Sequence, residues 1–587
     1  MANTTREFKH RDVVSNFLFK TVVNQGNNKE TLVALFKRSH HPDLHTYQGK
    51  LAPISGSIDA SDANPLAAAI REIREETHLV TDKDLSLGFC GKPFSFADEK
   101  IGRSWTVYPF GWKFAGVSAE SSIQIDWEHS GWEWVQPEQV LSGAIEDKCV
   151  PNLDKSLRRV YFGPLGLFPG NTGWITPHNA AGKTFLSGLF TLKTDNENGA
   201  RVLATKALEC LQKIVKDFGE NISGKEEQMG EDSEWWTCLR VAAWQLIYSG
   251  RPSMNAAISS AILKALRGAL PKIHTGSMTG FQEIESVLSQ TISERSASST
   301  KISKAFESYI SSLENWPFLD EITIVTLSSS STIRASILHL LASHTNLKLQ
   351  LHILESRPLC EGASLAASLI TSFREISTSD LGRLKITIIP DTHITHIIST
   401  PSSSARILLL GADRISRSGN VSNKMGSLSA AIICRTLCPD MKIVVCSETD
   451  KIAKPSSLSI VEKITSMSGA AIEEESQKEM QEHLPESNDA KEVTRVWEVA
   501  GAGKDVLETL TLSSKTRPGD VEAQGTTAKR KSQQVKVENI YFEWVPAKYI
   551  DAYVSDEGVI GRQEIWDKSL EIGRLEEEVF GQLYGDD

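Results

Sequence analysis

The strongest constraint on the fold lies in the C-terminal half of the chain, where five short apolar runs are each followed by a segment of helical character. Between residues 321 and 447 the runs are EITIVTL, LKLQLHIL, LKITIIP, ARILLLGA and MKIVVCS. Short apolar runs that alternate with helical segments are typical of parallel strands joined by crossover helices. The alternation therefore predicts an α/β domain with a doubly wound parallel sheet that carries helices on both faces.

Composition changes along the rest of the chain and divides it into segments of different character. The N-terminal segment is rich in aromatic and β-branched residues, which favour strands. A long central segment instead repeats apolar residues at helical spacing. The predicted divisions are a strand-rich domain at 12–140, a connector at 141–190, a helical subdomain at 191–318, a Rossmann-like domain at 319–475 and 535–587, and a mostly disordered insertion at 476–534.

The charge balance and the cysteine pattern limit the classes of function. The 587 residues contain 63 Lys and Arg against 74 Asp and Glu, a net charge of -11, so we expect no direct nucleic-acid binding and no membrane-surface binding. The 8 cysteines include no CxxC pair, which favours reduced thiols in a cytoplasmic protein. The sequence has neither an apolar signal core at its start nor a run of about 18 apolar residues, so we expect no membrane span.

A helix predicted within GSIDASDANPLAAAIREIREETHL, residues 56–79, brings carboxylates together. Glu72, Glu75 and Glu76 stand at i, i+3 and i+4, so their side chains converge. Carboxylates that close repel one another unless protons or a divalent cation relieve the repulsion, and Mg²⁺ (or Mn²⁺) suits such oxygen ligands. Arg71, four residues before Glu75, can orient that carboxylate. The alternative interpretation is a solvated face of Glu and Arg that binds no metal.

The order Arg-Glu-Ile-x-Glu-Glu-x-x-Leu that begins at Arg71 resembles the Nudix box, whose pattern ends Arg-Glu-aliphatic-x-Glu-Glu-x-Gly-aliphatic. The segment WEHSGWEWV, residues 127–135, is similar to a late strand of that family. The resemblance covers residues 12–140. It implies an α/β/α sandwich and an enzyme that hydrolyses a nucleoside diphosphate linked to another group, using metal-activated water.

The resemblance also implies roles for the charged residues. Arg71 would belong to the catalytic group, and Glu75 or Glu76 would hold Mg²⁺. Glu72 would be a further ligand or a base that orients water. Glu128 is a candidate for an additional metal carboxylate, and a plain surface glutamate is its alternative.

The box departs from the family pattern at two places. His78 stands where the family has Gly after the glutamate pair. The distance from Gly56 to Arg71 is one residue longer than in the pattern, so the position eight before Arg71 is Ala63, with Asp62 beside it. Both departures concern the loops at the ends of the helix, whereas the helix carboxylates are present.

Four polar segments in the C-terminal half are candidates for an anion site. Two of them, TLSSSSTIRAS (326–336) and ESRPLCEGASL (355–365), follow an apolar strand and open a helix. Ligands bind at such carboxyl ends in doubly wound sheets, and backbone N–H groups at a helix N-terminus attract anions. The others are SGRPSMNAA (249–257) and LLLGADRISRSGNVSNKMGS (408–427). For the segment TLSSSSTIRAS, the alternative is a serine-rich helix cap that binds no ligand.

Together these segments resemble one superfamily, which contains the alpha, beta and delta subunits of translation initiation factor 2B, methylthioribose-1-phosphate isomerase and ribose-1,5-bisphosphate isomerase. GADRI followed by NKMG, ESRP-x-x-EG and the closing YFEWVPAKYIDAYVSDEG carry the resemblance. It covers residues 190–475 and 535–575. It implies a sugar-phosphate site and a homodimer formed through the C-terminal domain.

Isomerases of this superfamily pair a Cys with an Asp, and the Asp matches Asp413. The position of the Cys is Ser328 here, and a serine hydroxyl is a poor acid–base at neutral pH. Glu361 stands where the isomerases tend to have Gln. The resemblance therefore favours sugar-phosphate binding without isomerisation. The expected binding residues are Arg251, Ser328, Ser329, Ser330, Arg357, Glu361, Asp413, Asn423 and Lys424.

Three hypotheses about function follow. The first is a Mg²⁺-dependent Nudix-type hydrolase joined to a domain that binds a sugar phosphate. The second is a non-catalytic regulatory or binding protein of the initiation factor 2B class with a degenerate Nudix domain. The third is a sugar-phosphate aldose–ketose isomerase, which Ser328 argues against. The expected small-molecule partners are accordingly a nucleotide, a sugar phosphate, or both.

Overall fold

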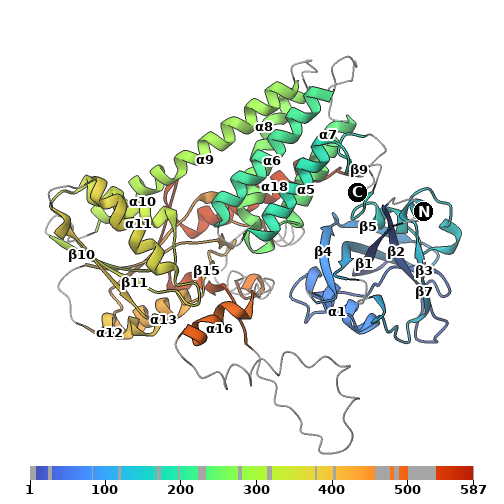
Figure 1. Ribbon diagram of the computed structural model, residues 1–587, viewed down its shortest axis with the longest axis horizontal. Coiled ribbons are helices and arrows are strands. Elements are labelled where there is room, and N and C mark those ends of the chain that lie inside the picture. The colour runs from blue at the N-terminus through green and yellow to red at the C-terminus, as the bar shows by residue number, and fades with distance from the viewer. Residues whose placement is uncertain are drawn as a thin grey trace, which may run out of the picture. The chain divides into compact units, whose positions relative to one another are not determined.

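The chain folds into two compact units that both combine sheets with helices, so the predicted α/β class is confirmed (Figure 1). The first unit comprises Met1–Ser296, Asp450–Leu484 and Asp567–Asp587, and the second comprises Ala297–Thr449 and Pro485–Trp566. None of the described helices has the length and apolar character that a membrane crossing requires. The computed structural model describes all residues except 1–7, 24–28, 82, 117–119, 164–165, 168–172, 196–197, 222–232, 275–279, 314–319, 377–379, 401–404, 456–475, 481–487, 500–536 and 586–587.

A seven-stranded sheet forms the N-terminal part of the first unit. Its strands β1 and β6 pair in parallel, whereas the other neighbouring strands pair antiparallel. The order is β3-β2-β1-β6-β4, with β5 on β6 and β7 on β2. The strands are β1 (Lys9–Val23), β2 (Lys29–Arg38), β3 (Leu51–Ala52), β4 (Leu85–Cys90), β5 (Phe94–Asp98), β6 (Arg103–Phe114) and β7 (His129–Val135).

The two faces of β1 pack against different helices, because successive strand residues point to opposite sides. Val14 and Leu18 join a buried cluster with Ile73 of helix α1 (Pro65–Thr77). Ser15 points to the other face, where its hydroxyl lies 2.9 Å from that of Ser156 in α4 (Leu153–Leu157). The sheet therefore lies between α1 and the segment that contains α4. That segment belongs to the stretch predicted as a connector, and α3 (Pro137–Leu141) lies where the predicted strand-rich domain ends and the connector begins.

The rest of the first unit is mainly helical. Its helices bury long apolar stripes, and Trp235 and Trp236 are each 1% exposed. Hydrogen bonds join this part to the strand-rich part: the Cys90 N–H donates to the Ser249 hydroxyl at 2.7 Å, and the Trp244 indole donates to the Cys90 carbonyl at 3.0 Å. The helices are α5 (Ala180–Thr194), α6 (Ala200–Asn221), α7 (Glu234–Tyr248), α8 (Asn255–His274), most of α9 (Gly280–Ser311) and most of α18 (Arg562–Phe580).

The second unit contains the predicted parallel sheet. The five apolar runs form five neighbouring strands that all pair in parallel, and a sixth strand, β18, extends the parallel set. The order is β12-β11-β10-β13-β16-β18-β19, so the chain reverses direction across the sheet between β10 and β13. The strands are β10 (Glu321–Leu327), β11 (Lys348–Leu354), β12 (Leu384–Ile389), β13 (Ala405–Leu410), β16 (Lys442–Cys446), β18 (Ala552–Ser555) and β19 (Gly558–Ile560).

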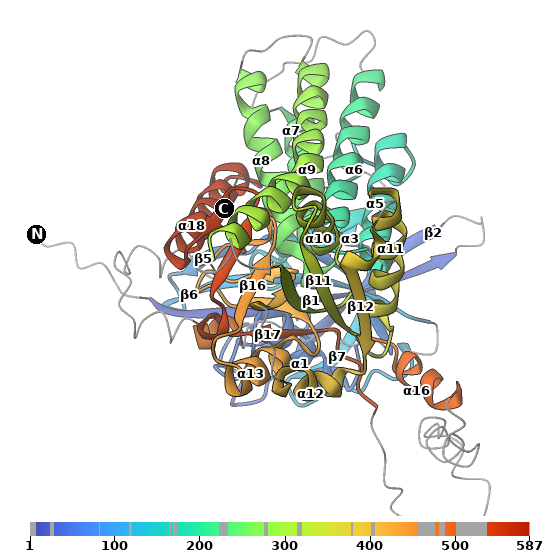
Figure 2. The same ribbon diagram turned by 90° about the vertical axis from the view of Figure 1, so that its left-hand side faces the viewer.

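Helices cover both faces of this sheet, as the alternation predicts. Figures 1 and 2 show α10 (Ser331–Ser343) and α11 (Glu361–Ile376) above the strands, and α12 (Ile394–Ser399) and α13 (Ser427–Leu437) below them. A separate small sheet joins β14 (Arg414–Ile415), β15 (Val421–Lys424) and β17 (Phe542–Val545).

The structure describes part of the segment 476–534, for which the sequence predicts a mostly disordered insertion. It contains α16 (Ala490–Val499). Glu492 of this helix accepts hydrogen bonds from Asn539, at 2.7 Å, and from the Tyr541 hydroxyl. These bonds anchor the helix to the segment that directly precedes β17. The polar composition hides these contacts, because they involve partners about 50 residues away. Residues 481–487 and 500–534 of the segment lie outside the described residues.

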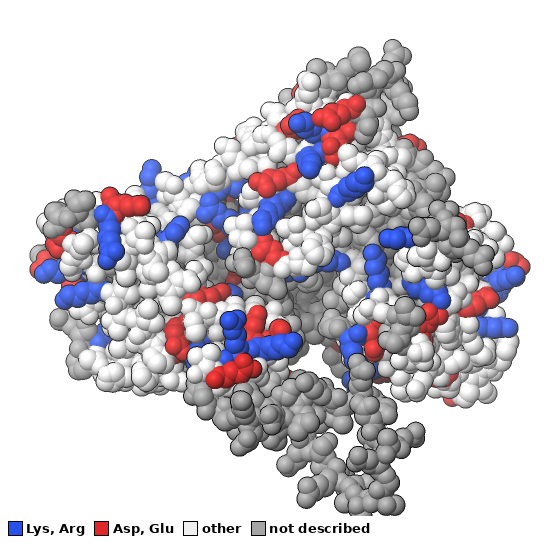
Figure 3. Space-filling model, viewed as in Figure 1, with Lys and Arg blue, Asp and Glu red and all other residues white. Residues whose placement is uncertain are grey.

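Charged side chains of both signs lie interspersed on the face drawn in Figure 3. One buried ionic cluster nevertheless stands out inside the first unit. The Asp450 carboxylate accepts hydrogen bonds from Ser260 at 3.1 Å and Lys264 at 2.6 Å on α8, and from Arg295 on α9. Burial opposes ionisation of Asp450, but Lys264 and Arg295 together hold its pKa below the usual value. The cluster therefore ties two helices to the 450 segment.

We predict that Asp450→Asn lowers the free energy of unfolding by about 3–5 kcal/mol at neutral pH, because it leaves the buried Arg295 without its counter-charge. The folded-state pKa is depressed, so this stabilisation is present above about pH 4 and is lost as the pH falls. Urea denaturation at pH 7 and at pH 3.5 measures the free energy of unfolding of both proteins at each pH. The exposed Asp440→Asn is the control, with an expected change within about 0.5 kcal/mol; an equal effect of the two variants would contradict the account of the cluster.

Candidate active site

Helix α1 is defined at both ends by local interactions. Asn64 caps the first turn by accepting the Ala67 N–H at 2.9 Å, and Pro65 occupies the first helical position. His78 ends the helix with φ 60°, and its N–H donates to the Arg74 carbonyl at 3.0 Å. His78 thus adopts the left-handed conformation that glycine favours at helix ends, so the helix end forms without the Gly of the Nudix pattern.

Arg71 connects the loop before α1 to the helix carboxylates. Its guanidinium donates to both oxygens of Asp62, at 3.1 and 2.8 Å, and to Glu72 at 2.7 Å and Glu75 at 3.0 Å. The hydrogen bonds from Arg71 hold the pKa of Asp62 below its usual value. The residue eight before Arg71 is Ala63, which cannot pair with a guanidinium. Its neighbour Asp62 supplies the acidic partner of Arg71 instead.

Glu72 is buried, with 8% of its surface exposed, in a space that Gly56 leaves open. A Cβ atom at residue 56 would lie 2.0 Å from Glu72 Oε1. Any larger residue at position 56 would therefore displace this carboxylate. Burial raises the pKa of Glu72, and the charge of Arg71 opposes that rise.

Glu76 is more deeply buried, with 2% of its surface exposed. Its Oε2 lies 2.5 Å from Nε2 of His129, the first residue of β7. Among the described residues, Glu76 Oε1 and His129 Nδ1 are buried and have no hydrogen-bond partner. Burial, and then the charges of Glu72, Glu128 and Asp126, raise the pKa of Glu76.

The predicted metal ligands are neighbours, but they do not all share one face. Glu75 is exposed, whereas Glu72 and Glu76 lie on the buried side of α1, and Glu128 is half-buried just before β7. In the described part of the chain, no three acidic, His or Cys side chains form a ready-made metal group. Arg71 engages Glu72 and Glu75, and His129 engages Glu76. The donor chemistry nevertheless fits a hard divalent cation, because burial disfavours the ionised forms of Glu72, Glu76 and Glu128 and one buried Glu76 oxygen has no partner among the described residues.

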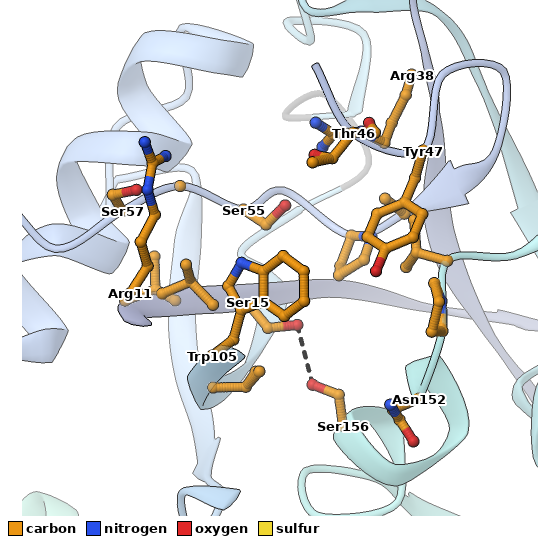
Figure 4. Close-up of a pocket in the computed structure, with 18 of the residues that line it drawn as sticks. Arg11, Ser15, Arg38, Thr46, Tyr47, Ser55, Ser57, Trp105, Asn152 and Ser156 are labelled. Carbon is orange, nitrogen blue, oxygen red and sulfur yellow. Dashed lines mark hydrogen bonds between the residues drawn. The ribbon is translucent and has the colours of Figure 1, made fainter. Parts of the chain in front are cut away.

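A cavity of about 340 Å³ opens beside this carboxylate group (Figure 4). Residues on one face of the paired strands β1 and β6 line it, with Arg11 opposite Trp105 in the register. Figure 4 shows Arg11 beside Ser57 at one side, Tyr47 at the other side, and the Trp105 ring between them. Its charged and aromatic lining residues are Arg11, Arg38, Asp43, His45, Tyr47, Glu72, Phe94, Phe96, Arg103, Trp105 and Glu128.

Two further features complete the cavity wall. The rings of Phe96 and Trp105 stack at a centroid distance of 5.1 Å. Asn152 and Ser156 line the cavity from the segment predicted as a connector, and Ser156 is held by Ser15. The predicted connector therefore forms part of the candidate site.

The sequence predictions missed the guanidinium and aromatic residues of this cavity. The available signal is the spacing of two in Arg11-x-Val13-x-Ser15 and in Arg103-x-Trp105-x-Val107, which places each set on one face of a strand. The parallel pairing of β1 with β6 brings the two sets together. That pairing joins residues more than 90 positions apart and leaves no local trace in the sequence.

The second unit brings several of the predicted binding residues to the carboxyl ends of β10 and β13. Ser328 is buried with φ 66°, and its N–H donates to the Ser356 hydroxyl at 2.7 Å. Ser330 caps α10 by accepting the Ile333 N–H at 3.3 Å, which matches the serine-cap alternative. Ser329 lies between them.

Asn423 lies in β15 of the small sheet, and Asp413 directly precedes β14 of the same sheet. The Asp413 N–H donates to the Ser422 carbonyl at 2.9 Å, and the Asn423 amide donates to the Ser427 hydroxyl at 2.9 Å. A Cβ atom built at Gly411 would lie 3.6 Å from Asn423 Oδ1 and 3.8 Å from Ser330 Oγ, so the residues from both strand ends do approach one another.

Lys424 is already paired in this arrangement. Its ammonium lies 3.0 Å from Glu361 Oε1 and 4.8 Å from the centre of the Tyr541 ring. Together with Arg357 these residues border a space of only about 20 Å³, which is room for a water molecule. Arg251 belongs to the first unit, where its guanidinium donates to the Asp195 carbonyl at 2.6 Å.

Comparison with known proteins separates the chain into two matched regions. Residues 20–156 match the NUDIX domain model. The chain is also similar to methylthioribose-1-phosphate isomerases: that of Bacillus pumilus is 35% identical over 95 residues, 16% of this chain and 24% of the relative. That of Vanderwaltozyma polyspora is 26% identical over 214 residues, 36% of this chain and 41% of the relative. The chain thus spans less than half the length of these relatives.

The chain also has similarity to solved structures, at low sequence identity. The Pyrococcus horikoshii OT3 translation initiation factor eIF-2B is 17% identical, with 64% of this chain and 96% of that chain covered and a TM-score of 0.39. The eIF2B beta structure from Chaetomium thermophilum is 11% identical, with 67% and 92% covered and a TM-score of 0.40.

The model of the initiation factor 2 subunit family matches residues 196–562, which is more than half of the chain. The chain therefore belongs to the initiation factor 2 subunit family, and it carries a Nudix domain at residues 20–156.

Proposed function

We propose that the chain is a hydrolase that depends on a divalent cation and cleaves a nucleoside diphosphate linked to another group. The cavity of about 340 Å³ in the Nudix domain carries this proposal. It places guanidinium groups, which suit phosphate oxygens, and aromatic rings, which suit a planar base, beside Glu72 and Glu128. An aromatic lining with a few placed charged groups is the usual composition of a small-molecule site.

Each group has a distinct role in this proposal. Glu72, Glu75 and Glu76 would hold Mg²⁺ (or Mn²⁺), with Glu128 as an additional carboxylate. When bound, the cation supplies charge neutralisation on the diphosphate and lowers the pKa of water. Arg71 keeps Glu72 and Glu75 oriented through its hydrogen bonds.

The cavity itself would orient the substrate. Arg11 and Arg103 would bind its phosphate oxygens, and the face of Trp105 would stack on its ring. Phe96 stacks on the Trp105 ring and so supports its orientation. These contacts would position the diphosphate next to the carboxylate group.

We predict that Glu75→Gln lowers hydrolysis with Mg²⁺ by about 100-fold or more, since a preorganised charged group at the reacting centre is lost. Stability should change by less than about 0.5 kcal/mol, because the side chain is exposed and its ion pair with Arg71 is a surface pair. The assay is phosphate or nucleotide release from a panel of nucleoside diphosphate sugars and dinucleoside polyphosphates. Glu571→Gln, an exposed glutamate on α18, is the matched control and should keep full activity. Equal rates for the two variants, or no turnover of the panel by the unaltered protein, would contradict the proposal.

A second prediction concerns Gly56. Gly56→Ala should displace Glu72 from its place beside Arg71 and lower hydrolysis by about tenfold or more, because the new methyl group would collide with the carboxylate. The loss of that charged hydrogen bond should also lower the free energy of unfolding by about 1–3 kcal/mol. Gly131→Ala in β7 is the control, since a Cβ there meets nothing within 4 Å. Comparable losses in both variants would show that Gly56 has no special role.

The second unit supports a second candidate function, the binding of a sugar phosphate without isomerisation. The observation that favours it is the convergence of Ser330, Asn423 and Gly411 at the reversal point of the doubly wound sheet, where ligands of such folds bind. Ser328 in place of the isomerase Cys argues against turnover, because its hydroxyl ionises too poorly for proton transfer. Homodimerisation through this part of the chain is proposed from the family resemblance.

The ion pair of Lys424 with Glu361 gives this candidate a specific test. Glu361→Gln should strengthen the binding of a ribose phosphate about tenfold, because it frees Lys424 and removes a negative charge from the site. Lys424→Ala should weaken binding by a similar factor, and Glu375→Gln at the other end of α11 is the control. Calorimetry measures binding, and NMR of the mixture detects turnover. Aldose-to-ketose conversion that disappears in Asp413→Asn would instead favour the isomerase.

A further inference from the structure

The hydrogen bond between His129 and Glu76 has no role in the site as described so far. His129 opens β7, and Glu76 lies in the last turn of α1, so the bond joins two elements that are far apart in the sequence. Both side chains are buried, with 6% and 2% exposed, and Nε2 lies 2.5 Å from Oε2. A bond this short between buried groups fixes the rotation of both side chains.

The unpartnered atoms of the pair indicate where its proton lies. His129 Nδ1 is buried and has no hydrogen-bond partner among the described residues. A proton on Nδ1 would be a buried donor without an acceptor, which proteins rarely contain, whereas an unpaired acceptor is tolerated more often. The tautomer with hydrogen on Nε2 avoids the orphaned donor and donates to Glu76 Oε2.

The same bond decides what the other carboxylate oxygen can do. Because Oε2 accepts from His129, Oε1 is left buried and unpartnered within the described part of the chain. Phe36 packs on the imidazole at a centroid distance of 5.2 Å, and His129 is only 6% exposed, so packing restricts movement of the ring away from Oε2. Oε1 is thus the oxygen of Glu76 that is available to a cation.

We propose that His129 is a positioning residue that holds Glu76 by Oε2 and presents Oε1 as a ligand for the divalent cation. The inference rests on the proposed hydrolase function of the Nudix domain. His129 does not touch the substrate in this proposal, and it acts only through Glu76. Groups that orient a metal ligand in this way typically change metal affinity by about 10–100-fold when they are removed.

The test uses the full chain and Mn²⁺, whose binding is followed by electron paramagnetic resonance. His129→Phe keeps a ring beside Phe36 but removes the donor, so we expect Mn²⁺ affinity to fall about 10–100-fold. His129→Gln keeps an N–H donor at a similar distance from the backbone, so affinity should stay within about threefold, and this variant separates a hydrogen-bonding role from packing. His344→Gln, which alters another His–Glu pair in the second unit, is the matched control and should change nothing.

Two further measurements distinguish the inference from the function on which it rests. ¹⁵N NMR of histidine-labelled protein should show His129 as the Nε2–H tautomer, assigned by its loss in His129→Gln. The metal concentration for half-maximal hydrolysis should rise in His129→Phe more than the rate at saturating metal falls. Mn²⁺ binding in the unaltered protein without hydrolysis of any substrate would sink the hydrolase but support the positioning role. Unchanged affinity in His129→Phe, equal losses in the Phe and Gln variants, or no Mn²⁺ binding by the unaltered protein would each overturn the role of His129.

Discussion

The arrangement of the Nudix-domain site depends on the guanidinium of Arg71. It is shared by Asp62, Glu72 and Glu75, and it therefore ties the loop before α1 to successive turns of the helix. A planar group with five N–H donors can satisfy three carboxylates at once, which an ammonium group cannot do in the same geometry. Since Asp62 and Glu72 are largely buried, removing their shared counter-charge would leave uncompensated charge in the interior. The hydrogen bond from Arg71 therefore helps to hold the Glu72 carboxylate in the space that Gly56 leaves open.

Glu76 is one turn further along α1, and its surroundings differ in kind. Burial raises the pKa of both Glu72 and Glu76, but Arg71 opposes the effect only for Glu72. Glu76 instead contacts the imidazole of His129, and the charges of other carboxylates raise its pKa more than Arg38 lowers it. The electrostatic strain of the site is therefore concentrated on Glu76. A divalent cation bound near its free oxygen would relieve that strain, and an anionic substrate would gain from the same cation.

Local patterns in the sequence predicted the elements of the fold well and their contacts less well. The five apolar runs became the parallel strands because period and length are local properties. The spacing of Glu72, Glu75 and Glu76 located the carboxylate helix, but not which of them it buries, since that depends on Gly56 and His129. The role of Asp62 was not predicted, because the loop from Gly56 to Arg71 is one residue longer than the family pattern and only the structure shows the contact of Asp62 with Arg71. The cavity could not be predicted from local patterns because the long-range pairing of β1 with β6 creates it. Helix α16 was not predicted because its contacts involve partners that are distant in the sequence.

The two candidate sites differ in how completely the protein satisfies its own charges. In the second unit Lys424 is paired with Glu361 and covered by the Tyr541 ring, so a phosphate must displace a carboxylate before it gains the ammonium. In the Nudix domain an oxygen of Glu76 is buried and has no partner among the residues that the structure describes, and guanidinium groups line a cavity large enough for a nucleotide portion. A ligand would add interactions in the Nudix domain, whereas in the second unit it must exchange existing interactions for new ones. On physical grounds the unsatisfied site is the one that a ligand stabilises more, and this asymmetry supports the proposal that the Nudix domain carries the chemistry.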